Sequence, residues 1–126
     1  MKWLWRQATG ELLQQIDDNL LSDVIATGYS GMGDGKNDPT KQGVGDVGPI
    51  PRGAYTIKDP VDEPSLCTLP LTPNPSNNMY GRSGFLIHGD SVQAPGWASQ
   101  GCIILGLDAR KKIAESSIND LLVVKE

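Results

Sequence analysis

Residues Gly84 to Leu105, GFLIHGDSVQAPGWASQGCIIL, form the stretch around which the rest of the chain can be interpreted. This stretch contains the only histidine of the protein, His88, and one of its two cysteines, Cys102. One apolar run precedes the histidine, at residues 85–87, and another follows the cysteine, at residues 103–105. Short apolar runs bounded by glycine and proline are typical of buried strands. The stretch therefore predicts two strands that bring His88 and Cys102 to neighbouring strand ends across a loop.

A cysteine beside a histidine is a candidate nucleophile together with its base. The imidazole can accept the thiol proton, and the thiolate can then attack an acyl carbon. Gly101 precedes Cys102 and allows a tight bend, at which the N–H groups of Cys102 and Gly101 can hold the resulting oxyanion. The alternative is purely structural, because a lone histidine and a buried cysteine are common packing residues.

Composition restricts both the fold and the function. A chain of 126 residues suffices for one domain, residues 1–126, with its own core. Fifteen glycines and nine prolines favour a turn-rich β fold. The net charge of −4 argues against nucleic-acid binding, because neutralising phosphates requires a basic face. No apolar run reaches the roughly 18 residues of a membrane span, so none is expected.

Other segments have recognisable strand or helix composition. Strands are expected at residues 3–5, 24–29, 54–57 and 121–124. Residues 11–21 present a conflict, because their apolar residues have helical spacing but the segment lies between two expected strands. The proline-rich residues 59–78 predict an extended segment. One short helix is expected over Ala109 to Ser116, with Asp108 as its N-cap. The cations of this helix, Arg110, Lys111 and Lys112, are expected on its solvated face.

A glycine-rich segment, residues 30–48, contains the literal pattern G-x-G-x-x-G at residues 43–48. A dinucleotide-binding fingerprint must open a helix, but Pro49-Ile50-Pro51 follows here. We therefore interpret this segment as a surface loop that borders the cleft of His88 and Cys102.

The order of these motifs resembles that of the L,D-transpeptidases, peptidoglycan enzymes in which a histidine precedes a Ser-His-Gly-Cys segment. Here Ile-His-Gly at residues 87–89 precedes Ser-Gln-Gly-Cys-Ile at residues 99–103. Gln100 replaces the second histidine, as in the L,D-transpeptidase effectors of type VI secretion systems, which are antibacterial toxins. Two upstream blocks, residues 28–31 and 48–57, resemble the same family. The resemblance implies a mostly β, L,D-transpeptidase-like β-sandwich of mixed sheets with one short helix and a β-meander at the start.

The resemblance also implies the reaction and its residues. Cys102, deprotonated by His88, is expected to attack the carbonyl before the terminal D-alanine of a tetrapeptide stem, and the thioester then passes to water or to an amine. Further catalytic positions are Ser99, Gly101 and Gly89, whose carbonyl would orient His88. No metal and no cofactor are implied.

Candidate substrate-binding residues are Tyr29, Arg82 and Asp90. Arg82 is expected either to hold a stem carboxylate or to be a solvated charge. Asp90 is also an alternative to Gly89 for orienting His88. One position departs from the family, because a polar residue commonly lies two places after the cysteine and Ile104 stands there. Two other classes remain open: a papain-like cell-wall endopeptidase, in which the cysteine comes first in the chain, and a non-catalytic wall-binding module.

The expected substrate, peptidoglycan stem peptides, lies outside the cytoplasm. The apolar part of Met1–Gln7 ends at Arg6 and is shorter than the apolar region of a secretory signal peptide. We therefore expect a protein that is made in the cytoplasm, exported by a secretion apparatus and active in the periplasm of a target cell, with a cognate immunity protein as a further partner. Because a disulfide would block Cys102, we expect it and Cys67 to be free thiols.

Overall fold

Ten β-strands and one α-helix make up the computed structural model, which describes residues 1–126. The strands are β1 (Lys2–Arg6), β2 (Glu11–Asp17), β3 (Leu20–Leu21), β4 (Ala26–Thr27), β5 (Tyr29–Ser30), β6 (Gly53–Ile57), β7 (Leu69–Pro73), β8 (Leu86–His88), β9 (Ile103–Ile104) and β10 (Asp120–Val124). The helix is α1 (Leu107–Glu115), and two 3₁₀ turns, η1 (Gly33–Gly35) and η2 (Pro39–Lys41), lie between β5 and β6.

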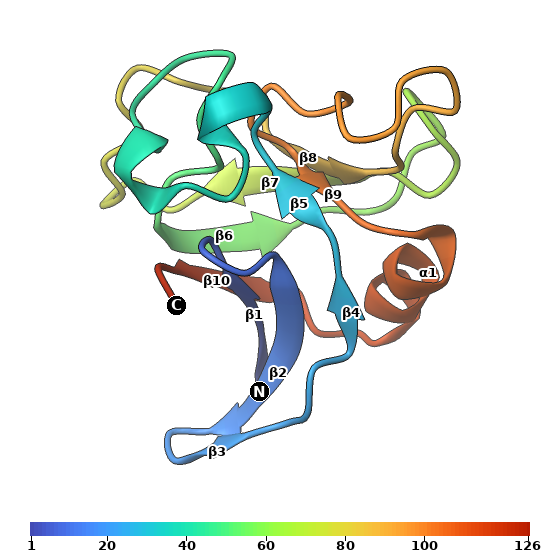
Figure 1. The fold of residues 1–126 in the computed structure, drawn as a ribbon. Helices are drawn as coiled ribbons and strands as arrows, with labels where there is room; N and C mark the ends of the chain where they lie inside the picture. The colour runs from blue at the N-terminus through green and yellow to red at the C-terminus, as the bar shows by residue number, and fades with distance from the viewer.

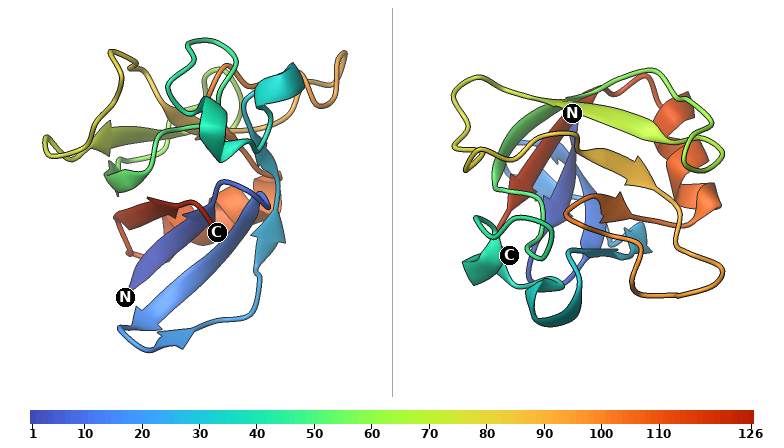
Figure 2. Two further views of the ribbon diagram at one scale, coloured as in Figure 1. Left: turned by 60° about the vertical axis from the view of Figure 1, so that its left-hand side comes forward. Right: turned by 90° about the horizontal axis from the view of Figure 1, so that it is seen from above.

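The strands join into one curled, mixed sheet in the order β3-β2-β1-β10-β6-β7-β8-β9-β5, with β4 paired to β2. β1 runs parallel to β10 and β8 runs parallel to β9, whereas β10–β6, β6–β7 and β7–β8 are antiparallel. The curl brings the half formed by β1, β2 and β10 to face the half formed by β7, β8 and β9 (Figures 1 and 2). The predicted mostly β fold of mixed sheets with one short helix is therefore confirmed.

The hydrophobic core lies between the two halves of the sheet. Its fifteen buried residues include Trp3 and Trp5 of β1, Ile87 of β8 and Ile103 of β9, all with no exposed surface. Ile87 is the register partner of both Leu69 and Ile103, so three neighbouring strands of the second half present buried residues side by side. Because side chains alternate along a strand, the next residues, His88 and Ile104, point to the opposite face of this half.

The structure shows that the segment with conflicting helix and strand signals, within residues 11–21, forms strands. Residues 11–17 form the strand β2, in which Leu12 and Leu13 are both buried, and the helical spacing has no structural counterpart. Pairing with β1 and β4 supplies the context that overrides local propensity. The expected strand over residues 24–29 is only partly correct, because Val24 lies outside every strand and is 44% exposed.

The helix α1 also differs from the expectation in two details. Its N-cap is Gly106, not Asp108, and no side chain caps its first turn. Arg110, expected on the solvated face, is buried with 5% of its surface exposed. This guanidinium turns back over the start of the helix, as long side chains in helices commonly do, and donates to the carbonyl oxygens of Leu105 and Leu66.

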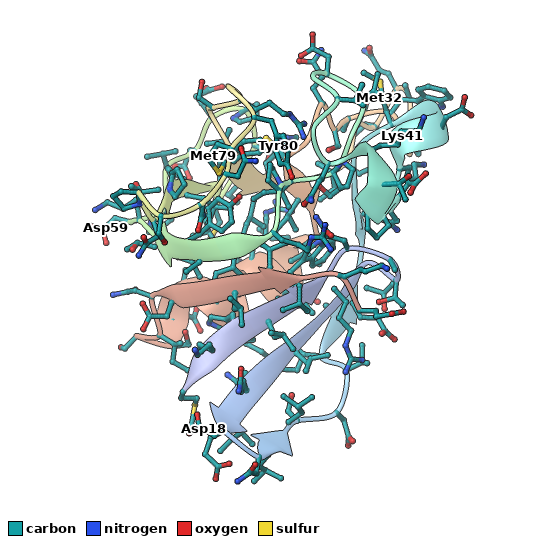
Figure 3. All side chains as sticks on the ribbon, turned by 90° about the vertical axis from the view of Figure 1, so that its left-hand side faces the viewer. Asp18, Met32, Lys41, Asp59, Met79 and Tyr80 are labelled. Carbon is teal, nitrogen blue, oxygen red and sulfur yellow. The ribbon has the colours of Figure 1, made fainter.

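The remaining segments agree with the sequence. Residues 43–48 open no helix, and Cys67 and Cys102 are free thiols. Asp18 lies at the tip of the β2–β3 hairpin. The loop that carries Met32 and Lys41 lies at the opposite end of the molecule (Figure 3). The single α-helix is too short and too polar to cross a membrane.

Two leucine-to-alanine changes test which side chains hold the two halves of the sheet together. Leu121 in β10 is 1% exposed, and Leu121→Ala should lower the free energy of unfolding by about 2–5 kcal/mol, because it leaves a cavity between the halves. Leu20 in β3 is 51% exposed, so Leu20→Ala should change it by less than about 0.5 kcal/mol. Urea unfolding followed by tryptophan fluorescence measures both, and equal losses would contradict this description of the core.

Candidate active site

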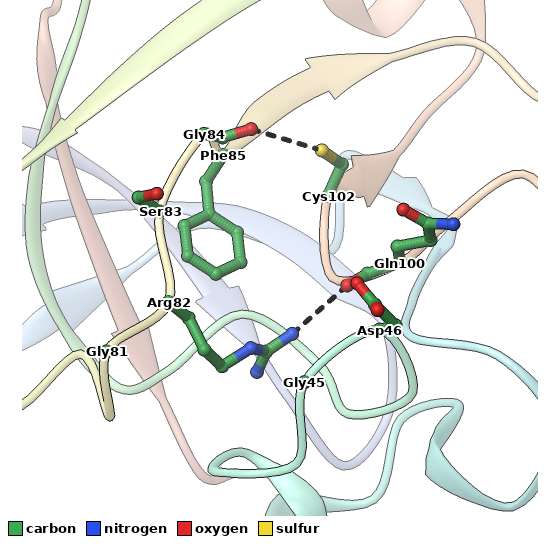
Figure 4. Close-up of a pocket in the computed structure, with 9 residues that line it drawn as sticks. All are labelled: Gly45, Asp46, Gly81, Arg82, Ser83, Gly84, Phe85, Gln100 and Cys102. Carbon is green, nitrogen blue, oxygen red and sulfur yellow. Dashed lines mark hydrogen bonds between the residues drawn. The ribbon is translucent and has the colours of Figure 1, made fainter.

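Cys102 lies just before β9 and faces a cavity of about 300 Å³. The Leu86 N–H donates to the Cys102 Sγ over 3.3 Å, and the Sγ lies 3.9 Å from the carbonyl oxygen of Gly84 (Figure 4). The other walls of the cavity come from Phe85 and from three loops, with residues Gly45, Asp46, Gly81, Arg82, Ser83 and Gln100. A ligand in this cavity would therefore touch the sulfur directly.

His88 ends β8, and its ring is held by the next peptide group. Its Nδ1 lies 2.8 Å from the carbonyl oxygen of Gly89. Because a carbonyl oxygen only accepts, this contact requires the proton on Nδ1 and leaves Nε2 with a lone pair. The carbonyl of Gly89 thus occupies the orienting position that the sequence analysis assigned to it.

His88 ends β8 and Cys102 immediately precedes the neighbouring strand β9, but the two side chains make no hydrogen bond to each other. His88 pairs in register with Ile104, two residues after Cys102, and residues two apart share a face of a sheet. His88 borders a separate hollow with Ser65 and Ala98. The contact between a nucleophile and its base is often loose before substrate binds, so this arrangement is compatible with proton transfer once the cleft is filled.

The thiol of Cys102 is neutral at rest. Burial raises its pKa, and the Leu86 N–H and the positive charge of Arg82 oppose this effect only in part. A neutral thiol needs a base to become a nucleophile, in contrast to a cysteine whose surroundings already favour the thiolate. The chain has one histidine, so His88 is the candidate base.

Ser99 holds the bend before Cys102 rather than the imidazole. Its buried hydroxyl donates to the carbonyl of Cys102 and accepts from the N–H groups of Gly101, over 3.1 Å, and Gly31, over 2.8 Å. The expectation that the Gly101 N–H serves as an oxyanion donor is therefore wrong in this structure, because that N–H is already bonded. The Cys102 N–H has no partner in the chain and remains available.

Sequence reasoning missed the role of Ser30. This serine is fully buried in β5, donates to the carbonyl of Gly101 over 2.8 Å and accepts from the Ile50 N–H over 2.9 Å. It thereby ties the cysteine loop to β5 and to the turn before β6. The signal was present, because Ser30 lies inside the upstream block at residues 28–31, but its contact with Gly101 is 71 positions away in sequence.

Arg82 is held by backbone carbonyls and is not a solvated charge. Its guanidinium donates to four backbone carbonyls, those of Gln42, Gly48, Pro49 and Gln100. It also lies 5.2 Å from the centre of the Phe85 ring. The expectation of a solvated charge is wrong, whereas a contact with a substrate carboxylate stays a prediction: the side chain joins the glycine-rich loop to the cysteine loop and lines the cavity (Figure 4).

Tyr29 and Asp90 bind each other. The Tyr29 hydroxyl donates to Asp90 Oδ1 over 2.6 Å and accepts from the Ala98 N–H, while Asp90 accepts from the Gly96 N–H. Burial and the contact with Asp90 raise the pKa of Tyr29 to about 12. These bonds close the loop between His88 and Cys102, and Asp90 does not contact His88 Nδ1.

The fold and these contacts define a small β domain that presents a cysteine and a carbonyl-oriented histidine on adjacent strands. Comparison with protein-family models matches residues 25–125 to the Tlde1 domain. The chain belongs to this family of type VI secretion effector domains. No curated protein and no solved structure gives a significant match.

Two glycine-to-alanine changes beside Cys102 test the bend. Gly101 has φ +134°, and an added Cβ would lie 2.4 Å from Arg82 Nη2 and 2.9 Å from Phe85 Cε1. Gly101→Ala should therefore lower the free energy of unfolding by about 1–3 kcal/mol and disturb the loop. Gly45 lines the same cavity, and its Cβ would meet nothing within 4 Å, so Gly45→Ala should leave stability unchanged. Denaturant unfolding measures the free energy of unfolding of both variants. A value for Gly101→Ala equal to that of the wild type would show that alanine is not strained at this position.

The raised pKa of Cys102 predicts the pH dependence of its alkylation. In a Cys67→Ala variant, Cys102 is the single thiol. The pH midpoint at which its rate of alkylation by iodoacetamide rises should be higher in the folded protein than in the protein unfolded in urea. The sign follows from burial, which disfavours the thiolate in the folded state. Mass spectrometry of the alkylated fraction gives the rate as a function of pH in each of the two states. A folded-state midpoint at or below the urea midpoint would contradict the neutral resting thiol.

Proposed function

We propose that this protein is a peptidoglycan-modifying cysteine enzyme with L,D-carboxypeptidase and L,D-transpeptidase activity on tetrapeptide stems. The observation that supports this most is the placement of Cys102 and His88 on one face of the parallel pair β8–β9, with His88 Nδ1 on the Gly89 carbonyl. This arrangement leaves His88 Nε2 free to accept a proton from the nucleophile. Membership of the Tlde1 family supports an antibacterial role.

The first half-reaction forms a thioester. His88 Nε2 takes the Cys102 proton, and the thiolate attacks the carbonyl carbon that precedes the terminal D-alanine. The negative charge that develops on the carbonyl oxygen is stabilised by the free Cys102 N–H, and a donor of this kind supplies about 3 kcal/mol. The C–N bond then breaks, and the imidazolium returns its proton to the departing amine of D-alanine.

The second half-reaction releases the acyl group. His88 takes a proton from water or from an amine, which attacks the thioester carbon and expels the Cys102 thiolate, and the sulfur regains the proton. Water yields a tripeptide stem, and a free D-amino acid yields an exchanged tetrapeptide. The base contributes about 10²–10⁴ in rate to such steps.

Water and small amines are the acceptors that the surroundings of the site favour. A second stem would bring carboxylates that need cationic partners. Arg82, the cation that lines the cavity of Cys102, donates to four carbonyls, and Ile103, Ile104 and Leu105 form an apolar run after the cysteine. Hydrolysis and D-amino-acid exchange are therefore proposed over the formation of new cross-links.

The proposed place of action is the periplasm of a target cell. Peptidoglycan lies there, and family membership supports delivery by a type VI secretion apparatus, with an immunity protein that protects the producing cell. A papain-like endopeptidase is less well supported, because His88 precedes Cys102 in this chain. A non-catalytic wall-binding module would give the oriented imidazole no role.

Three single variants, assayed on tetrapeptide muropeptides with mass spectrometry of the products, test the proposed function. Cys102→Ala should abolish turnover, and His88→Ala should reduce it by about 10²–10⁴, because the neutral thiol then lacks its base. Cys67→Ala removes the other thiol and should leave turnover unchanged. Wild-type rates in either of the first two variants would refute the mechanism. Products dominated by cross-linked dimers would refute the proposed choice of acceptor.

A further inference from the structure

A second cavity, of about 450 Å³, borders the site on the side of His88. Gly89, which follows His88, and Ile104, which lies two residues after Cys102, both line it. The cavity of Cys102 lies at the beginning of β8, next to Gly84 and Phe85, whereas the second cavity lies where β8 and β9 end. The two cavities therefore flank the candidate catalytic pair from opposite ends of the same two strands.

Arg110 lines this second cavity and carries a buried charge without a counter-ion. It is 5% exposed, and the one ion pair of the structure joins Arg6 to Glu11. The guanidinium donates to the carbonyls of Leu105 and Leu66, and its Nε–H has no partner. Burying an uncompensated cation is costly, and burial lowers the pKa of Arg110 accordingly. An anion in the adjoining cavity would compensate this charge.

The amino terminus of α1 opens on the same cavity. Gly106 and Leu107, at the start of this nine-residue helix, both line it. The N-cap Gly106 offers no side-chain acceptor, so the first N–H groups of the helix lack the usual cap. A helix amino terminus carries a partial positive charge and favours anions. Arg110 and the helix thus supply two separate sources of positive potential at one place.

One anionic group also borders the cavity. The carboxylate of Asp90 is held by the Tyr29 hydroxyl and by the N–H groups of Ser91 and Gly96, on the loop side. Its charge disfavours a second carboxylate nearby. An anionic ligand group is therefore expected beside Arg110 and Leu107 rather than beside Asp90.

We propose that this second cavity is a carboxylate-binding subsite formed by Arg110 and the amino terminus of α1. The further assignment of that carboxylate to the stem peptide that reacts at Cys102 rests on the function proposed above. The cavity adjoins the peptide group of Gly89 that orients His88, so a stem held there by its carboxylate would extend past the imidazole towards the sulfur. Arg82, in the other cavity, is already occupied and does not duplicate this role.

Gly106 allows a test that leaves the fold intact. Its φ of −64° and ψ of 161° suit any residue, and an added Cβ meets nothing within 4 Å. Gly106→Asp and Gly106→Asn both supply an N-cap, which preserves or raises stability. Both new side chains would accept from the N–H groups at the start of α1 and so compete with a bound carboxylate. Only the aspartate adds a negative charge, so the difference between the two variants isolates the effect of charge.

The first experiment measures binding without turnover. N-acetyl-D-alanine is titrated into the protein, and the NMR signals of the Leu107 and Asp108 amides and the Arg110 Nε–H are followed. Saturable shifts are expected in the wild type; binding should weaken in Gly106→Asn, whose side chain competes for the helix N–H groups, and weaken at least roughly fivefold further in Gly106→Asp. N-acetyl-D-alaninamide, which lacks the carboxylate, should cause none. No saturable shift, equal binding of the amide or equal affinity of the two variants would overturn the subsite.

The second experiment assigns the ligand. With tetrapeptide substrate, Gly106→Asp should raise KM by roughly fivefold or more over Gly106→Asn with kcat unchanged, and added salt should narrow the difference. An unchanged KM alongside positive NMR shifts would overturn the assignment to the stem while the subsite stands. Absence of any turnover in the wild type would refute the function proposed above, and with it the assignment to the stem, but the NMR titration would still decide the subsite.

Discussion

The parallel pairing of β8 with β9 is the constraint on which the site depends. Ile87 and Ile103 are register partners and are fully buried in the core. Their burial fixes the position of both strands along the strand direction, relative to the opposite half of the sheet. A shift by one residue would turn both isoleucines outward. The burial of two apolar residues thus determines where His88 and Cys102 lie on the outer face, although neither of them belongs to the core.

Loops around this pair are held by backbone carbonyls and buried polar side chains more than by ion pairs. Arg82 and Arg110 each direct a guanidinium at carbonyl oxygens, and Ser30 and Ser99 bond both sides of the bend at Gly101. Such contacts are directional and need neither a carboxylate nor an additional apolar residue. They allow a glycine-rich and proline-rich chain, which has few helices to support its loops, to keep a defined cleft.

Much of the fold could be predicted from the sequence, because strands made of short apolar runs between glycine and proline can be recognised from the local sequence alone. The orientation of His88 by Gly89 likewise depends on adjacent residues. Local reasoning failed for Arg82 and Arg110, whose carbonyl partners lie up to 44 residues away in the sequence. Residues 11–17 show the same limit, since only pairing with β1 and β4 distinguishes their strand from a helix. The bond between the Gly101 N–H and the Ser99 hydroxyl is local, because the residues lie two positions apart, and a serine turn of this kind could have been predicted from the sequence.

The position of β10 has a consequence for how the protein is assembled. This strand is inserted between β1 and β6 and links the two halves of the sheet on one side, while the segment of β4 and β5 links them on the other side through β2 and β9. Without residues 120–124, the pairings of β4 with β2 and of β5 with β9 are the ones that still join the two halves. The pairing of β1 with β10 joins residues of very high sequence separation, a kind of contact that slows folding.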